Sequence, residues 1–214
     1  MAFTPRPPVW RMLGTMLATV LLCSGCVSGS PKTTQFYTLE PLALSPAEGG
    51  GATGHGSTTP LSVEVAALRL PQYLERPQIV TREGGNRLFL SEFNQWGGNL
   101  QKDLMRTMAL NFSLLLATPN VAITPYHPPT PADYRVEVEV MRFEKGEAGE
   151  VTLLAQWRLL KQGQQAPVAT RMTTLGGKPS ATANGYDGTV ATMSRLWGEL
   201  STLIARTIRQ DARG

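Results

Sequence analysis

The chain has 214 residues, of which 42% are hydrophobic, 7% aromatic and 17% charged. This length suits one compact domain with a substantial core and excludes a disordered tail. Two cysteines and two histidines are too few for a disulfide scaffold or for a zinc site built from Cys and His alone. The net charge of +4 is compatible with nucleic-acid binding, and the positions of the charges along the chain decide whether this function keeps its support.

Residues 1–25 have the composition of a signal peptide. Arg6 and Arg11 precede the apolar run 12–22, and small residues follow it. That run is too short to cross about 30 Å of hydrocarbon, which argues against a permanent transmembrane anchor. Cleavage before Cys26 would remove both arginines and no acidic residue, which lowers the net charge from +4 to +2. Nucleic-acid binding therefore loses its support.

The sequence Leu22-Cys23-Ser24-Gly25-Cys26 resembles a lipobox, in which small residues precede the cysteine that becomes the acylated N-terminus of a bacterial lipoprotein. Cys23 stands where the motif usually has Leu. We predict a covalent lipid on Cys26 and no other cofactor. Residues 26–33 would then form a lipidated tether, and several acyl chains would hold the protein firmly on a membrane.

Residues 34–214 are predicted to form a single domain that begins with strands. The segments 35–39 and 61–65 read as two strands, separated by a flexible insertion rich in Gly and Pro at about 41–60. The runs 78–82 and 87–91 flank Gly84-Gly85 and predict a hairpin.

Two long helices and an antiparallel meander complete the expected α+β fold. Leu100, Leu104, Met108 and Phe112 share one face of a helix over about 96–117, whose end at Leu114–Leu116 we expect to be buried. Further strands are expected at 121–124, 134–140, 151–159 and 168–175, with a bulge near Met141-Arg142, and a last helix at 189–210 with Asp187 as its N-cap. The predicted architecture is a mostly antiparallel sheet packed by two long amphipathic helices.

The residues offer no evident catalytic or metal site. G-x-S-x-G, Walker, H-E-x-x-H and C-x-x-C motifs are absent from the sequence. His55 falls in the Gly-rich insertion and His127 between prolines, away from any activated nucleophile. We therefore expect a protein that is not an enzyme and holds no metal ion.

One segment has the composition of an interaction surface. Tyr73, Leu74, Arg76 and Pro77 combine an aromatic, an aliphatic and a charged side chain between two prolines, as interfaces do. We predict a partner interface there. A loop that only covers the edge of the sheet would give the same pattern.

Several segments together carry a family resemblance. They are the lipobox at Cys26, Phe36–Leu39, Leu70–Arg82, Leu88–Trp96 and Tyr186–Ser194. With these residues the chain resembles the PqiC/YmbA family of auxiliary lipoproteins of ABC-type transport systems over nearly the whole mature chain. Leu70–Arg82 is the most specific part of the resemblance.

The resemblance implies a non-enzymatic lipoprotein on the inner leaflet of the outer membrane, facing the periplasm. Val27, which is not the Asp associated with inner-membrane retention, agrees with that location. The implied partners are an MCE-domain protein and an ABC-type permease system that move lipids or other hydrophobic compounds between two membranes. Self-association into a ring, the substrate and the direction of transport stay open.

Two other functions compete with a docking role. The protein could itself carry a lipid or small apolar ligand between helix and sheet, with Leu104, Phe112 and Trp157 as the lining, although such residues are more often plain core. An envelope hydrolase would depend on His127. These alternatives differ in whether the domain holds a ligand or turns over a substrate.

Overall fold

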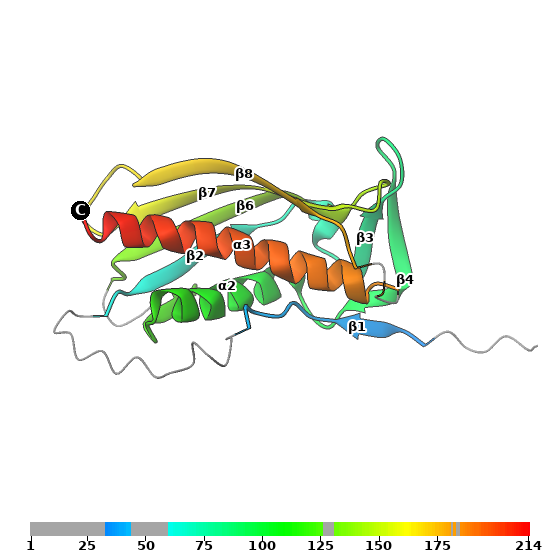
Figure 1. The fold of residues 1–214 in the computed structure, drawn as a ribbon, viewed down its shortest axis with the longest axis horizontal. Coiled ribbons are helices and arrows are strands. Elements are labelled where there is room, and N and C mark those ends of the chain that lie inside the picture. The colour runs from blue at the N-terminus through cyan, green and yellow to red at the C-terminus, as the bar shows by residue number, and fades with distance from the viewer. Residues whose placement is uncertain (1–32, 44–59, 126–130, 181, 183–184) are drawn as a thin grey trace, which may run out of the picture. The chain divides into compact units, whose positions relative to one another are not determined.

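The computed structural model describes residues 33–43, 60–125, 131–180, 182 and 185–214, and its elements all lie within Thr34–Gly214. In chain order they are β1 (Gln35–Tyr37), β2 (Val63–Arg69), the 3-10 helix η1 (Gln72–Leu74), β3 (Gln78–Arg82), β4 (Leu88–Trp96), α2 (Leu100–Leu116), β5 (Val121–Ile123), β6 (Tyr134–Lys145), β7 (Val151–Lys161), β8 (Ala169–Gly177) and α3 (Asp187–Asp211) (Figure 1). The predicted signal peptide 1–25, Cys26, most of the tether, and both His55 and His127 lie outside the described residues.

The strands form one mixed sheet of eight strands. Its order is β1-β4-β3-β6-β2-β5, while β7 pairs with β6 and β8 with β7. The meander β6–β7–β8 and the hairpin β3–β4 are antiparallel, as predicted. The pairs β1–β4, β2–β5, β2–β6 and β3–β6 are parallel, so the expectation of a mostly antiparallel sheet is only partly confirmed. Side-chain alternation marks a strand but does not reveal the direction of a partner distant in sequence.

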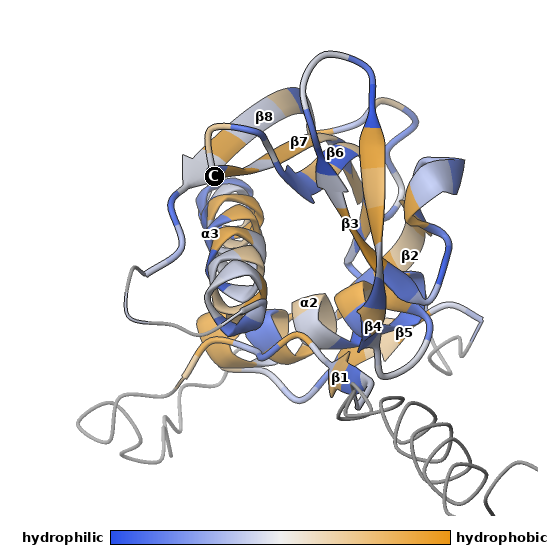
Figure 2. Cartoon of the chain, turned by 90° about the vertical axis from the view of Figure 1, so that its right-hand side faces the viewer, coloured by the Kyte–Doolittle hydropathy of each residue, from blue (hydrophilic) through white to orange (hydrophobic). Residues whose placement is uncertain are grey.

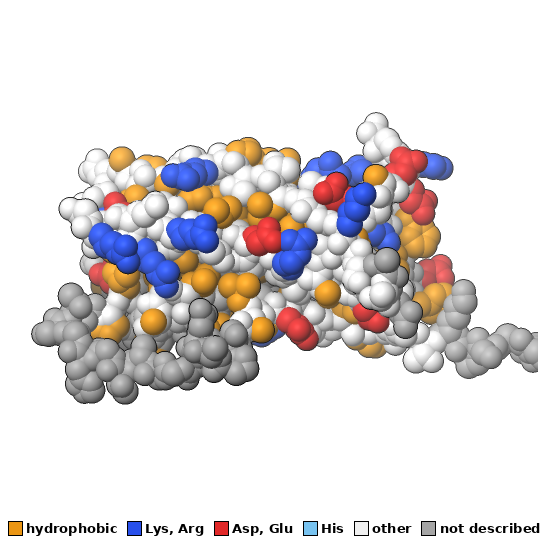
Figure 3. All heavy atoms as spheres, viewed as in Figure 1, with side chains coloured by type: hydrophobic (Ala, Val, Ile, Leu, Met, Phe, Trp, Pro, Cys, Tyr) orange, Lys and Arg blue, Asp and Glu red, His pale blue; other side chains and the backbone are white. Residues whose placement is uncertain are grey.

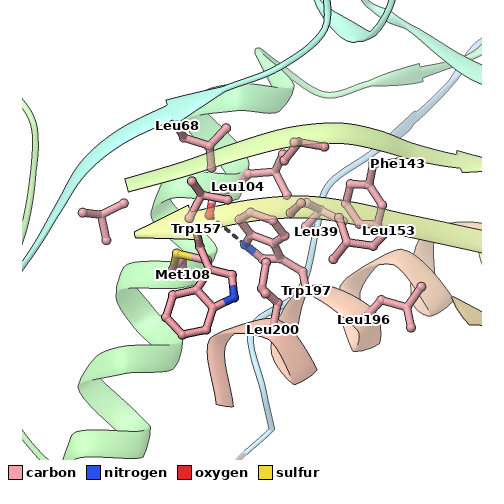
Figure 4. Close-up of a cluster of buried hydrophobic side chains, with 14 of the residues drawn as sticks. Leu39, Leu68, Leu104, Met108, Phe143, Leu153, Trp157, Leu196, Trp197 and Leu200 are labelled. Carbon is pink, nitrogen blue, oxygen red and sulfur yellow. Dashed lines mark hydrogen bonds between the residues drawn. The ribbon is translucent and has the colours of Figure 1, made fainter. Parts of the chain in front are cut away.

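The two helices close the concave side of this sheet (Figure 2). Helix α2 contacts β2 and β5, α3 contacts β6, β7 and β8, and the helices contact each other. Between them the buried Trp197 indole N–H donates to the carbonyl oxygen of Leu104 at 3.0 Å (Figure 4). This bond satisfies the polar atom of the indole and ties α3 to α2 inside the core.

The chain that follows β1 also packs against the helices, before the predicted insertion, whose residues 44–59 lie outside the described part of the chain. The backbone N–H of Leu39 donates to Asp103 at 2.7 Å, and that of Leu42 donates to Asn111 at 2.8 Å. Gly198 permits this approach, because a Cβ there would lie 2.5 Å from the Leu42 side chain. Hence residues 39–42 are held by α2 and α3, although β1 itself ends at Tyr37.

Two predicted helix starts are wrong by a few residues. Strand β4 continues to Trp96, and α2 begins only at Leu100, after Gly97-Gly98, with the Asn99 side chain accepting from the Lys102 backbone N–H at 3.0 Å. Trp96 fits the helical spacing of Leu100 and Leu104, but the glycine pair and the cap decide the boundary. Asp187 is the first residue of α3 and not its N-cap, a position that Tyr186 occupies without a side-chain bond.

The end of α2 also differs from the prediction. Leu114, Leu115 and Leu116 are half-buried, and Leu115 and Leu116 pack against the core, so the expected burial of this end is only partly confirmed. The helix ends at Ala117, whose φ of 51° is left-handed and stops further helical bonding. Within the described chain, no helix is both long and apolar enough to cross a membrane.

Candidate interaction surface

The predicted interface segment connects β2 to β3. Pro71 precedes η1, and the backbone N–H of Leu74 donates to the Pro71 carbonyl at 2.9 Å. The N–H of Glu75 then donates to Gln72 at 3.1 Å. At the other end, the carbonyl of Pro77 accepts from the Trp96 N–H at 2.7 Å. The prolines and these bonds therefore fix the course of residues 71–77 against β4.

The four predicted interface residues have different environments. Leu74 is 3% exposed and belongs to the hydrophobic core, so its side chain anchors the segment. Tyr73 and Arg76 are half-buried, and Pro77 is exposed. The structure therefore leaves Tyr73, Arg76 and Pro77 available on the surface, together with the exposed Glu75.

A buried carboxylate holds this segment in place. Glu144, at the end of β6, is 0% exposed, and its Oε2 accepts from the Tyr73 hydroxyl at 2.8 Å and from the Phe143 backbone N–H at 3.0 Å. Its Oε1 accepts from Nε of Arg82 at 2.9 Å and from Nε of Arg142 at 3.1 Å. We call these four side chains, Tyr73, Arg82, Arg142 and Glu144, the Glu144 cluster.

Burial and hydrogen bonding to Glu144 change the pKa values of two side chains of the cluster. Burial, and then the hydrogen bond to Glu144, raises the pKa of the Tyr73 hydroxyl above its usual value of 10.0. The hydrogen bond to Glu144 raises the pKa of Arg82 as well. At neutral pH the tyrosine is thus protonated and the arginine charged, which is the arrangement of a structural brace and not of an acid/base pair.

Arg76 carries an unusual feature within the predicted interface. Its Nε is buried and has no hydrogen-bond acceptor among the described residues. Buried donors without an acceptor are rare, because the lost hydration costs about 1–3 kcal/mol.

The predicted ligand lining does not border a described hollow. Leu104, Phe112 and Trp157 are fully buried in the core, and the Trp157 indole N–H donates to Thr173 at 3.0 Å. The surface hollows lie elsewhere: one of about 420 Å³ between residues 37–43 and α3, and one of about 220 Å³ beside the start of α2. In the part of the chain that the structure describes, no three Cys, His, Asp or Glu side chains are grouped to hold a metal ion.

Sequence reasoning predicted an interface at residues 71–77 but did not predict the cluster that holds this segment in place. Glu144, Arg82 and Arg142 look like ordinary polar strand residues when they are read one strand at a time. The signal was the parity change at Phe143, because a bulge there moves the next residue, Glu144, to the other face of the sheet.

Comparison with known proteins identifies related chains. The family model described as ABC-type transport auxiliary lipoprotein component matches residues 37–205. The chain is 25% identical over 190 residues to the intermembrane transport lipoprotein PqiC of Escherichia coli K12, which covers 89% of this chain and 94% of that protein. PqiC of Shigella flexneri matches to the same extent.

Solved structures share the fold. A protein of Xanthomonas campestris superposes with a TM-score of 0.64 at 19% identity, over 84% of this chain and 100% of that one. An uncharacterized protein superposes with a TM-score of 0.62 at 23% identity, over 82% of this chain and 99% of that one. Each covers most of both chains, so the domain described above is found as a unit in other proteins.

Proposed function

This chain belongs to the family of ABC-type transport auxiliary lipoprotein components, and from that membership we propose that it is the anchored docking component of an MCE-type intermembrane lipid transport system. The observation that carries the proposal is the match over residues 37–205, which spans β2 to β8, the segment 71–77, α2 and most of α3. Membership places the protein in the cell envelope as part of a transport system.

The proposed anchor is the acylated Cys26 in the inner leaflet of the outer membrane. The lipobox before Cys26 and the Val at position 27 support this location. The domain would then face the periplasm and work by binding, without catalysis and without a cofactor other than the covalent lipid. An MCE-domain protein and the ABC-type permease behind it are the proposed partners.

The proposed docking surface is the exposed part of residues 71–77. Glu144 and Leu74 hold this segment from below, so it would meet a partner with little loss of conformational entropy. Arg76 is half-buried and adds a positive charge to this segment. A partner with an acidic or carbonyl group at this point fits the surface best.

The test is affinity purification of the tagged lipoprotein from detergent-solubilised envelope. We expect recovery of an MCE-domain or permease component, and we expect Glu75→Arg to increase that recovery, because it replaces a negative charge beside Arg76 with a positive one and so favours an acidic partner. Glu139→Arg is the matched control, since Glu139 is also an exposed acidic residue but lies on β6, in a different element. Equal recovery by both variants would show that residues 71–77 are not the docking surface.

The anchor is tested separately. Cys26→Ala should abolish acylation, release the protein from the outer membrane and weaken envelope integrity. If the variant keeps its location and the envelope is unaffected, and no transport component is recovered with the wild type, the proposed function is wrong.

A further inference from the structure

Exposed apolar side chains gather on two neighbouring strands. Eight large apolar side chains of the described residues are at least about a third exposed, and four of them lie on the short strands β1 and β4. These four are Phe36, Phe89, Leu90 and Phe93, with exposures of 66%, 45%, 37% and 37%. The other four lie singly on α2, β6, β8 and α3. Leu90 follows Phe89 directly and therefore points to the opposite face of β4. We call the three aromatic residues, Phe36, Phe89 and Phe93, the β1–β4 surface.

Strand pairing explains why these side chains share one end of the domain. β1 runs parallel to β4, with Phe36 opposite Gln95 and Gln35 opposite Asn94. Adjacent strands are about 4.8 Å apart, so Phe36 lies diagonally across from Phe93. Figure 2 looks onto this end and shows the apolar half of β4 and strand β1 in front. In Figure 3, apolar side chains reach the surface at the right-hand end, where Figure 1 places β4.

The area of the β1–β4 surface is too small for a stable protein interface of its own. A buried aromatic side chain contributes about 150–250 Å², so the exposed parts of Phe36, Phe89 and Phe93 amount to roughly 300 Å². Stable protein interfaces bury about 800 Å² on each partner. An apolar surface of this size is within the range of the largest apolar patch on a typical soluble domain, about 300–600 Å², and such a patch often has a binding role.

The chain that precedes β1 indicates what this surface contacts. Nine residue steps separate Cys26 from Gln35, and an extended chain of that length spans about 30 Å. Helix α3 has 25 residues, begins beside β1 where the Tyr37 and Tyr186 rings are 6.5 Å apart, and rises about 37 Å toward the other end of the domain. A lipid on Cys26 would therefore keep the β1 end within about 30 Å of the bilayer, whereas the far end of α3 could lie well beyond that distance.

We propose that the β1–β4 surface lies on the lipid leaflet in which Cys26 is anchored, with Phe36 and Phe89 inserted among the headgroups and upper acyl chains. The inference rests on the proposed function, because it requires acylation of Cys26. The exposed Glu92 and Arg87 at the margin carry opposite charges, so apolar contact and not leaflet charge drives the association. The lipid and the surface together fix the orientation of the domain, with the C-terminal end of α3 directed away from the membrane.

The test uses the full mature lipoprotein in vesicles of phosphatidylethanolamine and phosphatidylglycerol. Once Cys23 leaves with the signal peptide and Cys26 is acylated, a cysteine introduced by Phe36→Cys or Phe89→Cys is the sole free thiol for a nitroxide label. Met172→Cys on β8 is the matched control, because Met172 is 55% exposed and lies in a different part of the sheet. Tryptophan fluorescence of Trp96, Trp157 and Trp197 verifies that each variant is folded.

When vesicles replace detergent, we expect the labels at 36 and 89 to become more accessible to oxygen and less accessible to a water-soluble nickel relaxant. The label at 172 should stay accessible to nickel. Equal nickel accessibility at all three positions on vesicles that carry acylated protein overturns the inference and leaves the proposed function standing. Protection that already exists in detergent, with dipolar broadening between labels, assigns the surface to a second copy and also overturns it. Protein that lacks the acyl chain and does not float with vesicles contradicts both proposals.

Discussion

Two carboxylates join distant parts of this domain, and they do so in contrasting surroundings. Glu144 accepts from the Tyr73 hydroxyl and two arginines with no exposure of its own side chain. Asp211, in the last turn of α3, accepts from the Tyr134 hydroxyl at 2.7 Å and pairs with Lys161 at 2.8 Å, and its side chain is 25% exposed. Both sites combine a tyrosine hydroxyl, a carboxylate and a cation, but only the carboxylate of Glu144 is fully buried.

The difference in exposure determines how strongly each carboxylate holds the segments that it joins. A buried carboxylate cannot exchange its partners for water, so losing one of them leaves an uncompensated group. An exposed carboxylate exchanges partners with little cost and is screened by salt. The Glu144 cluster should therefore keep residues 71–77 in one conformation, whereas the contact at Asp211 should hold the end of α3 more weakly.

The largest effect is expected for Glu144→Gln. The amide would bring N–H donors toward the tyrosine hydroxyl and the Phe143 N–H, or toward the arginines, and would remove the negative charge that both arginines share. We expect the free energy of unfolding to fall by about 3 kcal/mol. Urea unfolding followed by tryptophan fluorescence measures it. Glu139→Gln on the exposed side of β6 should change stability by less than about 0.5 kcal/mol, and similar losses in both variants would refute the brace.

A matched pair of tyrosine variants compares the two sites directly. Tyr73→Phe removes a hydrogen bond to a buried carboxylate and should cost about 2 kcal/mol. Tyr134→Phe removes the equivalent bond to Asp211, which keeps Lys161 and has access to water, and should cost about 1 kcal/mol. Unfolding of both variants under one set of conditions gives the comparison. The reverse order would mean that exposure of the carboxylate does not govern these contacts.

The smallest effect is expected for Asp211→Asn, at about 0.5 kcal/mol near neutral pH. Loss of a negative charge in the last turn of a helix favours the helix dipole and offsets part of the lost ion pair. At ~1 M salt, where the screening length is about 3 Å, the difference from wild type should shrink further. A difference that persists unchanged at high salt would place Asp211 in a less exposed setting than the structure shows.

The same variant has a defined pH dependence. The hydrogen bonds from Lys161 and then Tyr134 lower the pKa of Asp211 below its usual 3.8 in the folded protein. A lowered pKa in the folded state stabilises the protein above the usual value, and this stabilisation is lost as the pH falls through the folded value. The advantage of wild type over Asp211→Asn should therefore disappear in acid below the usual value and not at neutral or alkaline pH.

Local patterns predicted the meander and the bulge because they depend on neighbours in sequence. Alternation over Tyr134–Val140 and the parity change at Phe143 both follow from residues two positions apart. The parallel pairings were not predicted, since Gln35 and Asn94 meet across 59 positions with no local signal. The interface segment was recognised from composition, but burial of Leu74 depends on the sheet that η1 covers.

The bulge in β6 shifts the alternation of its side chains between the two faces of the sheet by one residue. Between Val140 and Arg142 the register moves by one residue. Without that shift Phe143 would face away from Trp197, whose ring lies 6.1 Å from its own, and Glu144 would point toward that indole. One additional residue thus assigns an aromatic ring to the hydrophobic core and a carboxylate to the Glu144 cluster, and deletion of Met141 should give a regular strand in which Phe143 and Glu144 keep their partners across β7.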